Sequence, residues 1–187
     1  MNRSVLLPVV CAALLWGCGK PSAQEYLARG QQAEKEAKAA ADTLLDRSAI
    51  AAAYAPVLEN YRQLVESYPN DPLAADAMFL IAAIEQNNLR NPDAAVESYK
   101  KFSGKYPDAP KAPLAMFLVA YIYNNEIGNI DSARVWYTRF LERYPSHDMA
   151  QSAQFELNNL GKTPDELLSA KVAAAPAPKG STDRQKH

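Results

Sequence analysis

The chain has 187 residues with 20 Lys and Arg against 21 Asp and Glu, and its formal net charge of -1 argues against nucleic-acid binding by bulk electrostatics. Hydrophobic residues make up 48% and charged residues 22%, which is typical of a folded globular chain and not of a disordered one. Two histidines and two cysteines are too few for a multi-ligand metal site or a disulfide framework, so we expect no metal and no other cofactor.

The first residues, MNRSVLLPVVCAALLWGCGK, carry one early positive charge at Arg3, an apolar run over residues 5–16 and a small residue before Cys18. This pattern is typical of a signal peptide. The apolar run is shorter than the roughly 20 residues that a membrane-spanning helix needs. We therefore expect residues 1–17 to be a cleaved leader.

The residues Leu15-Trp16-Gly17-Cys18 resemble the lipobox of bacterial lipoproteins, in which a Leu three residues before the cysteine and a small residue directly before it direct lipid transfer to the thiol. The resemblance implies an acylated Cys18 as the first mature residue, followed by a short tether over residues 18–23. Gly19 after the cysteine favours the outer membrane. The alternative is an ordinary secretory signal with an incidental Cys18.

Three stretches further along the chain align without a gap: NYRQLVESYP, SYKKFSGKYP and WYTRFLERYP. Each ends in a Tyr-Pro pair, and the prolines are 38 residues apart, at Pro69, Pro107 and Pro145. Self-similarity at a fixed period predicts a repeat architecture. Tyrosines at the same interval are expected to fill the core between repeats: Tyr61, Tyr99 and Tyr137.

Two helical patterns alternate within each repeat, because apolar residues recur at steps of three and four. Asp93 and Asp131 are expected to cap the second helices, and the prolines to stop them. Each repeat is then a helical hairpin, and the first hairpin begins with a long, charged helix. The predicted helices cover about 24–47, 50–68, 73–89, 93–105, 112–126, 131–143 and 148–160.

The second helices resemble those of the tetratricopeptide repeat, which carry a small residue, an aromatic residue four positions later and a proline eight beyond that. Ala95, Tyr99 and Pro107 fit this spacing, as does the set that ends at Pro145. The resemblance implies an all-α right-handed superhelix of about three helical hairpins and a capping helix. The expected divisions are a repeat domain over 24–160 (units 24–70, 71–108 and 109–146, cap 147–160) and a short helical turn with a flexible Ala/Pro tail over 161–187.

No catalytic motif stands out in the sequence. A Gly-rich phosphate loop, HExxH, GxSxG and paired cysteines are all missing. Ser146-His147-Asp148 contains the residue types of a triad, but adjacent residues do not normally form a relay, and the stretch precedes a predicted helix. Glu85 and Glu126 lie on separate helices without a supporting motif. We therefore predict no catalytic residues and a protein that is not an enzyme.

The tetratricopeptide resemblance implies a concave groove lined by the first helices, on the positions next to the small residues Ala82 and Ala120. Aromatic surface and amide groups in such a groove suit an extended peptide or a helix. The alternative is that Phe79 and Phe117 are ordinary core and that the amides are merely solvated. The predicted groove residues are Phe79, Ala83, Gln86, Asn87, Phe117, Tyr121, Asn124, Asn125, Phe155 and Asn159.

A lipobox followed by repeats that end in Tyr-Pro is similar to the BamD-like outer-membrane assembly lipoproteins, and more distantly to the periplasmic repeat protein of the Tol-Pal system. This resemblance implies a lipid-anchored, non-enzymatic scaffold of the bacterial envelope, with its domain in the periplasm and other envelope proteins as partners. The alternative is an accessory or binding subunit of a secretion, pilus or cell-wall machine, whose aromatic groove contacts glycan or an oligomeric secretin.

Overall fold

The computed structural model describes residues 20–44, 46–163, 165–166 and 169. The predicted leader, Cys18 and most of the predicted tail lie outside these residues. Within the described part the elements are helical, and no strand is present. They are α1 (Ala23–Ala41), α2 (Arg47–Ser67), α3 (Pro72–Asn87), α4 (Pro92–Lys105), α5 (Ala112–Ile122), the π-helix η1 (Tyr123–Ile127), α6 (Ile130–Arg143) and α7 (Ala150–Asn159).

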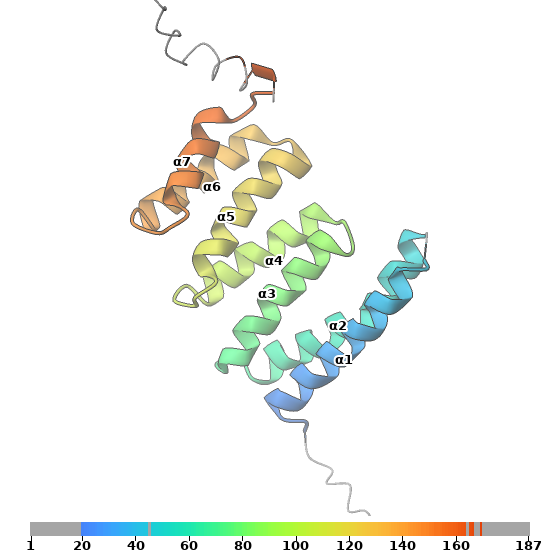
Figure 1. The fold of residues 1–187 in the computed structure, drawn as a ribbon. Coiled ribbons are helices and arrows are strands. Elements are labelled where there is room, and N and C mark those ends of the chain that lie inside the picture. The colour runs from blue at the N-terminus through green and yellow to red at the C-terminus, as the bar shows by residue number, and fades with distance from the viewer. Residues whose placement is uncertain (1–19, 45, 164, 167–168, 170–187) are drawn as a thin grey trace, which may run out of the picture.

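The helices stack in chain order along one direction, from α1 at the bottom of Figure 1 to α7 at the top. Pairs α1–α2, α3–α4 and α5–α6 form helical hairpins, and α7 packs on α6 as a single final helix. Each second helix also contacts the first helix of the next hairpin. This is the predicted all-α superhelix of three hairpins and a capping helix.

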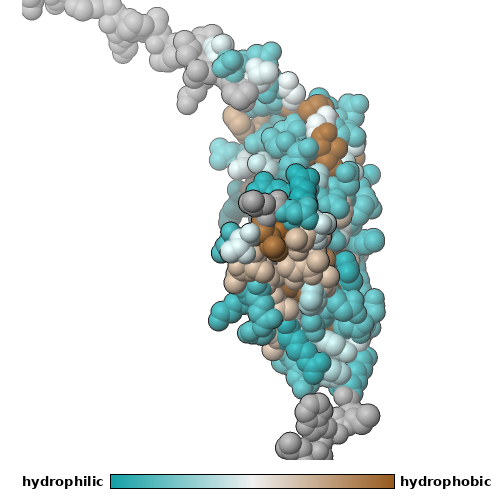
Figure 2. All heavy atoms as spheres, turned by 90° about the vertical axis from the view of Figure 1, so that its right-hand side faces the viewer, coloured by the Kyte–Doolittle hydropathy of each residue, from teal (hydrophilic) through white to brown (hydrophobic). Residues whose placement is uncertain are grey.

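The side of the stack that carries the hairpin tips faces the viewer in Figure 2. Hydrophilic side chains dominate this side, and hydrophobic residues gather in small areas. Among the described residues, no helix combines the length and the apolar composition that crossing a membrane requires.

The second helices α4 and α6 begin at asparagine caps. The side chains of Asn91 and Asn129 accept hydrogen bonds from the backbone amides three residues later, at 3.1 and 2.9 Å. The prediction that Asp93 and Asp131 are the caps was therefore wrong by two residues. Both lie in the first turn, where a carboxylate still interacts favourably with the helix dipole.

The first helix is shorter than predicted, because α1 ends at Ala41 and not near Arg47. Thr43 Oγ1 donates to the carbonyl oxygen of Ala40 at 2.9 Å and so satisfies one of the free carbonyls at the helix end. Asp46 then caps α2, since its side chain accepts a hydrogen bond from the amide three residues later at 3.1 Å. These local contacts at the tip of the hairpin end α1 at Ala41 and begin α2 at Arg47, so the charged segment predicted as one helix over 24–47 is divided between the two helices.

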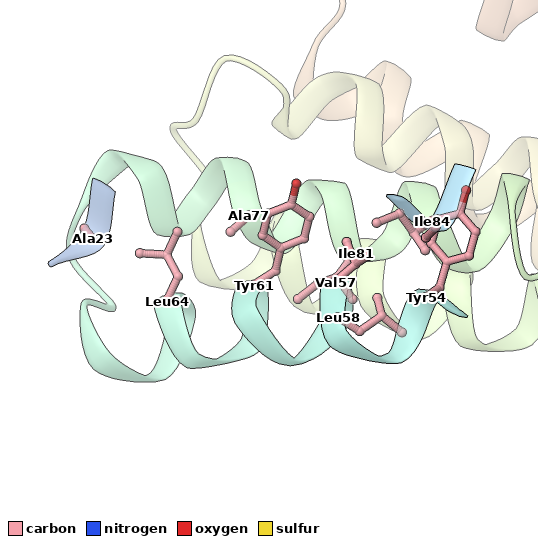
Figure 3. Close-up of a cluster of buried hydrophobic side chains, with 10 residues drawn as sticks. Ala23, Tyr54, Val57, Leu58, Tyr61, Leu64, Ala77, Ile81 and Ile84 are labelled. Carbon is pink, nitrogen blue, oxygen red and sulfur yellow. The ribbon is translucent and has the colours of Figure 1, made fainter. Parts of the chain in front are cut away.

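The hydrophobic core runs through the stack as three clusters. Figure 3 shows the first cluster, in which Tyr61 of α2 lies beside Ala77 and Ile81 of α3. Tyr61, Tyr99 and Tyr137 are at most 1% exposed, which confirms that the repeated tyrosines are core residues. Burying a large apolar side chain stabilises the fold by about 1.5–3 kcal/mol, so these positions are a principal source of stability.

The tyrosine of each Tyr-Pro pair connects the end of a hairpin to the start of the same hairpin. In all three hairpins the tyrosine hydroxyl donates to the backbone carbonyl of the proline that precedes the first helix. The pairs are Tyr68 with Pro21 at 2.8 Å, Tyr106 with Pro69 at 2.9 Å and Tyr144 with Pro107 at 3.4 Å. The tyrosine of the Tyr-Pro motif therefore holds the two ends of its hairpin together, in addition to ending a helix.

Candidate binding surface

The predicted groove residues occupy equivalent positions on three successive helices, because a shift of 38 residues carries α3 onto α5 with η1, and α5 onto α7. We call the surface that they form the first-helix face. On α3 it comprises Phe79, Ala83, Gln86 and Asn87; on α5 and η1, Phe117, Tyr121, Asn124 and Asn125; on α7, Phe155 and Asn159.

Two of the three phenylalanines of this face are half-buried against the following helix. Phe79 contacts the rings of Tyr99 and Phe102 edge-to-face, with centroids 5.3 and 5.5 Å apart. Phe117 makes the same two contacts with the equivalent rings of α6, at 5.5 and 6.0 Å. Edge-to-face pairs of this kind add about 0.5–1.5 kcal/mol beyond the buried area, so both phenylalanines serve packing as well as surface.

The third phenylalanine, Phe155, is 59% exposed, because within the described residues no helix covers it as α4 and α6 cover its counterparts. Tyr121 on α5 is 39% exposed. Exposed aromatic rings of this size are enriched at protein interfaces, where they supply large contact area at low entropic cost. They make the α5–α7 part of the first-helix face its most accessible apolar area.

Polar contacts connect neighbouring repeats across the face. Gln86 Nε2 donates to Glu126 Oε1 at 2.7 Å, and Tyr99 donates from its hydroxyl to Gln86 Oε1 at 3.4 Å. Burial, with the Glu126 and Glu85 carboxylates nearby, raises the pKa of the Tyr99 hydroxyl. The tyrosine therefore remains a neutral donor, and Gln86 is fixed between two neighbours.

Two of the remaining amides of the face, Asn125 and Asn159, are held by their own helices. Asn125 Nδ2 donates to the carbonyl of Tyr121 at 3.0 Å, and Asn159 Nδ2 donates to the carbonyl of Phe155 at 2.8 Å. These contacts orient the side-chain oxygens; that of Asn159 accepts from Lys162 Nζ at 3.0 Å. Asn87 is exposed, whereas Ala83 and Asn124 are half-buried. The face thus combines aromatic surface with oriented amides.

Ser146-His147-Asp148 has a structural role in the described chain. His147 Nδ1 accepts a hydrogen bond from the amide of Met149 at 3.1 Å, and its ring contacts the rings of Phe140 and Tyr144. Among the described residues, no three His, Cys, Asp or Glu side chains lie together as a metal site would require. This histidine packs the turn before α7.

Glu126 is the residue of this surface that sequence analysis did not select for binding. It lies in η1, where the helix widens to a π-turn, and it is exposed. The repeat register aligns Gln86 with Asn124, so the contact between Gln86 and Glu126 joins positions that differ by two. Amphipathic spacing carries no signal for such a local change in helix type, although π-turns are frequent at functional sites.

Residues 76–109 and 114–147 match the family model of the tetratricopeptide repeat, and each match covers the greater part of one hairpin. The matched segments include α4, α6 and most of their preceding helices, which confirms the expected repeat type in these two units. No curated protein matches the chain closely enough to be called a relative.

Proposed function

We propose that this tetratricopeptide-repeat protein is a lipid-anchored, non-enzymatic scaffold of the bacterial cell envelope that holds a segment of a partner protein on its first-helix face. Tetratricopeptide repeats generally mediate protein–protein interactions. The observation that carries the proposal is the pair of exposed rings on adjacent first helices, Tyr121 and Phe155, next to the oriented amides Asn125 and Asn159.

The chemistry of the face suits a peptide or an amphipathic helix. Apolar side chains of the partner would cover Tyr121 and Phe155, and its backbone or polar groups would meet the amides. Such recognition combines a few aromatic anchors with hydrogen bonds that fix orientation. A match of this kind needs no large charge, in keeping with the formal net charge of -1.

The N-terminal contacts support attachment close to a membrane. Lys20 Nζ lies 5.1 Å from the ring centroid of Tyr68, and the Pro21 carbonyl accepts the hydrogen bond of the same tyrosine. A lipid on Cys18 would therefore be two residues from a chain already fixed to the first hairpin. A double or triple acyl anchor gives stable membrane attachment. Hairpin α1–α2 would then lie next to the bilayer and the first-helix face further out.

A crosslinking pull-down from membranes tests both parts of the proposal. The natively expressed chain carries a tag after His187, and Cys18→Ala removes the lipid acceptor. Recovery of outer-membrane assembly components that depends on Cys18 is the expected result. Recovery of secretion, pilus or cell-wall proteins would favour an accessory subunit of such a machine, and capture that is unchanged by Cys18→Ala would contradict a role for the anchor.

The binding surface is tested by the double variant Tyr121→Ala with Asn125→Ala. We expect at least a fivefold loss of partner capture and little change in the melting temperature, because both residues are exposed. The matched control is Val135→Ala on α6, which removes a 46% exposed apolar side chain outside the face. A large loss of stability in the double variant, or equal loss of capture in the control, would overturn the assignment of the face.

A further inference from the structure

A concave site lies between helices α2, α3 and α4. It is a cavity of about 330 Å³, at the lower end of the range of roughly 300–1,000 Å³ for small-ligand pockets. Its apolar wall comes from Val65, Met78 and Ile81. On α3 these last two residues fall on a different side of the helix from Phe79 and Ala83, so the cavity is separate from the first-helix face.

A buried carboxylate lines this cavity. Glu85 is only 9% exposed, and its Oε2 atom has no hydrogen-bond partner within the described residues. Arg62 and Lys101 also line the cavity, yet neither forms an ion pair with Glu85 in the described structure. Leaving a buried acceptor unsatisfied is costly. Oε2 itself is closed to solvent, so a donor that enters the cavity would meet this carboxylate at its other oxygen, Oε1.

The next repeat shows how the same place is filled. A shift of 38 residues carries Ser98 onto Trp136, whose larger side chain is partly buried against the core cluster of α4 and α5. Lys100 Nζ lies 5.8 Å from the centroid of the Trp136 ring, and Arg139 Cζ lies 5.1 Å from it. In that repeat two cations therefore flank an indole.

The cations of the open cavity correspond to this pair. Arg62 is one repeat before Lys100, and Lys101 is one repeat before Arg139. The α2–α4 site thus has the cations that flank an indole in the next repeat, but it lacks the indole. Glu85 stands where the next repeat has Tyr123, whose hydroxyl already accepts a hydrogen bond from Lys100 Nζ at 2.7 Å.

We propose that the α2–α4 cavity binds the indole ring of a tryptophan side chain from a partner protein. The ring packs on Val65, Met78 and Ile81, its faces meet the cations, and its N–H donates to the Glu85 carboxylate. Each part of the indole has a counterpart in the cavity. The apolar wall contacts the edge of the ring, the cations lie against its π-face, and the Glu85 carboxylate accepts a hydrogen bond from its N–H. This site is independent of the first-helix face and of the lipid anchor.

Titration of 3-methylindole into the ¹⁵N-labelled full chain tests the site, with amide NMR shifts as the readout. We expect saturable shifts confined to α2, α3 and α4. The matched ligand 1,3-dimethylindole lacks the N–H and should bind at least fivefold more weakly. N-acetyltryptophanamide, which presents the ring as a partner would, should bind at the same place with an affinity within about threefold of 3-methylindole.

Two variants connect the binding to the cavity. Ser98→Trp supplies the ring from within, as Trp136 does, and should abolish the shifts while the helical circular dichroism is retained. Glu85→Gln keeps the shape and replaces a charged acceptor by a neutral one, and should weaken 3-methylindole several-fold with less effect on 1,3-dimethylindole. Because the two indoles are compared in the unaltered chain, the test stands even if a variant fails to fold.

Four outcomes would overturn the proposal. The first is that 3-methylindole causes no saturable shifts up to its solubility limit, and the second is that the two indoles bind with equal affinity. The third is that a folded Ser98→Trp variant binds 3-methylindole as well as the unaltered chain does. The fourth is that the chain binds 3-methylindole but does not bind N-acetyltryptophanamide. The last outcome would mean that the cavity admits a free indole and not a tryptophan side chain.

Discussion

Hairpins α3–α4 and α5–α6 share one register and one pattern of core residues, yet they differ where side chains reach solvent. Ala77 and Ala115 are both fully buried, as are Tyr99 and Tyr137. By contrast, Ser98 in the first of these hairpins corresponds to Trp136 in the second. The shared positions fill the same space in every repeat, whereas the variable positions leave cavities in one hairpin and close them in the next.

The turn after each second helix shows the same contrast. Ala109 lies at the edge of a cavity of about 480 Å³ that is also lined by Phe102 and Tyr106. One repeat later His147 stands in place of Ala109, and its ring packs on the two equivalent aromatics. A repeat array can thus keep its fold while single substitutions open or fill the spaces between its helices.

The largest expected effect separates a covered phenylalanine from its uncovered counterpart. Phe117→Ala should lower the free energy of unfolding by about 2–4 kcal/mol, because it removes two edge-to-face contacts and leaves a cavity. Phe155→Ala should change it by less than about 0.5 kcal/mol, since most of that ring is exposed. Urea denaturation measures both, and equal effects would mean that another part of the chain covers Phe155.

An effect that is smaller for each residue concerns the buried tyrosines that all three hairpins share. Burial raises the pKa of Tyr61, Tyr99 and Tyr137 above the ordinary value of about 10. The folded state therefore keeps these protons at a pH where the unfolded chain releases them. Stability should be complete below pH 10 and should fall above it, by at most about 1.4 kcal/mol per pH unit for each tyrosine.

Urea denaturation between pH 8 and pH 11 checks this alkaline dependence. Tyr99→Phe removes one of the three buried hydroxyls and should make the decline above pH 10 shallower. A variant whose pH dependence parallels that of the unaltered chain would contradict the assignment of the slope to these tyrosines.

The tyrosine hydroxyls should also distinguish the two hairpins at neutral pH. Tyr137 has a buried hydroxyl without a hydrogen-bond partner in the described structure, whereas the Tyr99 hydroxyl bonds to Gln86. Tyr137→Phe should therefore raise the free energy of unfolding by about 1 kcal/mol, and Tyr99→Phe should lower it by about 0.5–1 kcal/mol. Thermal melting of the two variants tests the opposite signs, and a loss of stability in Tyr137→Phe would indicate a partner for its hydroxyl.

The smallest effect concerns the turns inside the two hairpins, which place a left-handed residue directly before the asparagine cap. Gly128 has φ 77°, and Arg90 holds the equivalent position at φ 50°. Left-handed backbone costs an ordinary residue roughly 1 kcal/mol. Arg90→Gly should therefore stabilise the protein by up to about 1 kcal/mol, while Gly128→Ala should destabilise it by a similar amount. Calorimetry measures both changes. If Arg90→Gly also destabilised the protein, the Arg90 side chain would have to compensate for the cost of its left-handed backbone.

The fold could be predicted because the same sequence pattern occurs three times in the chain. The 38-residue interval, the apolar spacing and the Tyr-Pro pairs locate the second helices α4 and α6 closely. The end of α1 could not be predicted in the same way, since it depends on the local contacts of Thr43 and Asp46 at a tip that occurs once.

The candidate site was predictable in position but not in exposure. Sequence spacing places Phe79, Phe117 and Phe155 at one position of the repeat, and only the packing of the next helix distinguishes the two half-buried rings from the exposed one. The π-turn that brings Glu126 to Gln86 depends on local backbone geometry, which the amphipathic spacing of the sequence does not predict. The cavity beside Glu85 depends on the contrast between a serine and a tryptophan one repeat apart.

The hydroxyl-to-carbonyl links of the Tyr-Pro pairs also decide where the molecule can tolerate growth during evolution. The bonded proline and tyrosine are 47 residues apart in the first hairpin and 37 apart in the next two, and the link is kept in all three. Additional length has therefore gone into longer arms and the tip between α1 and α2, away from the junction. Insertions at a tip extend one arm and leave the pitch of the array unchanged, whereas an insertion beside Tyr106 would displace hairpin α5–α6 and helix α7, which follow it.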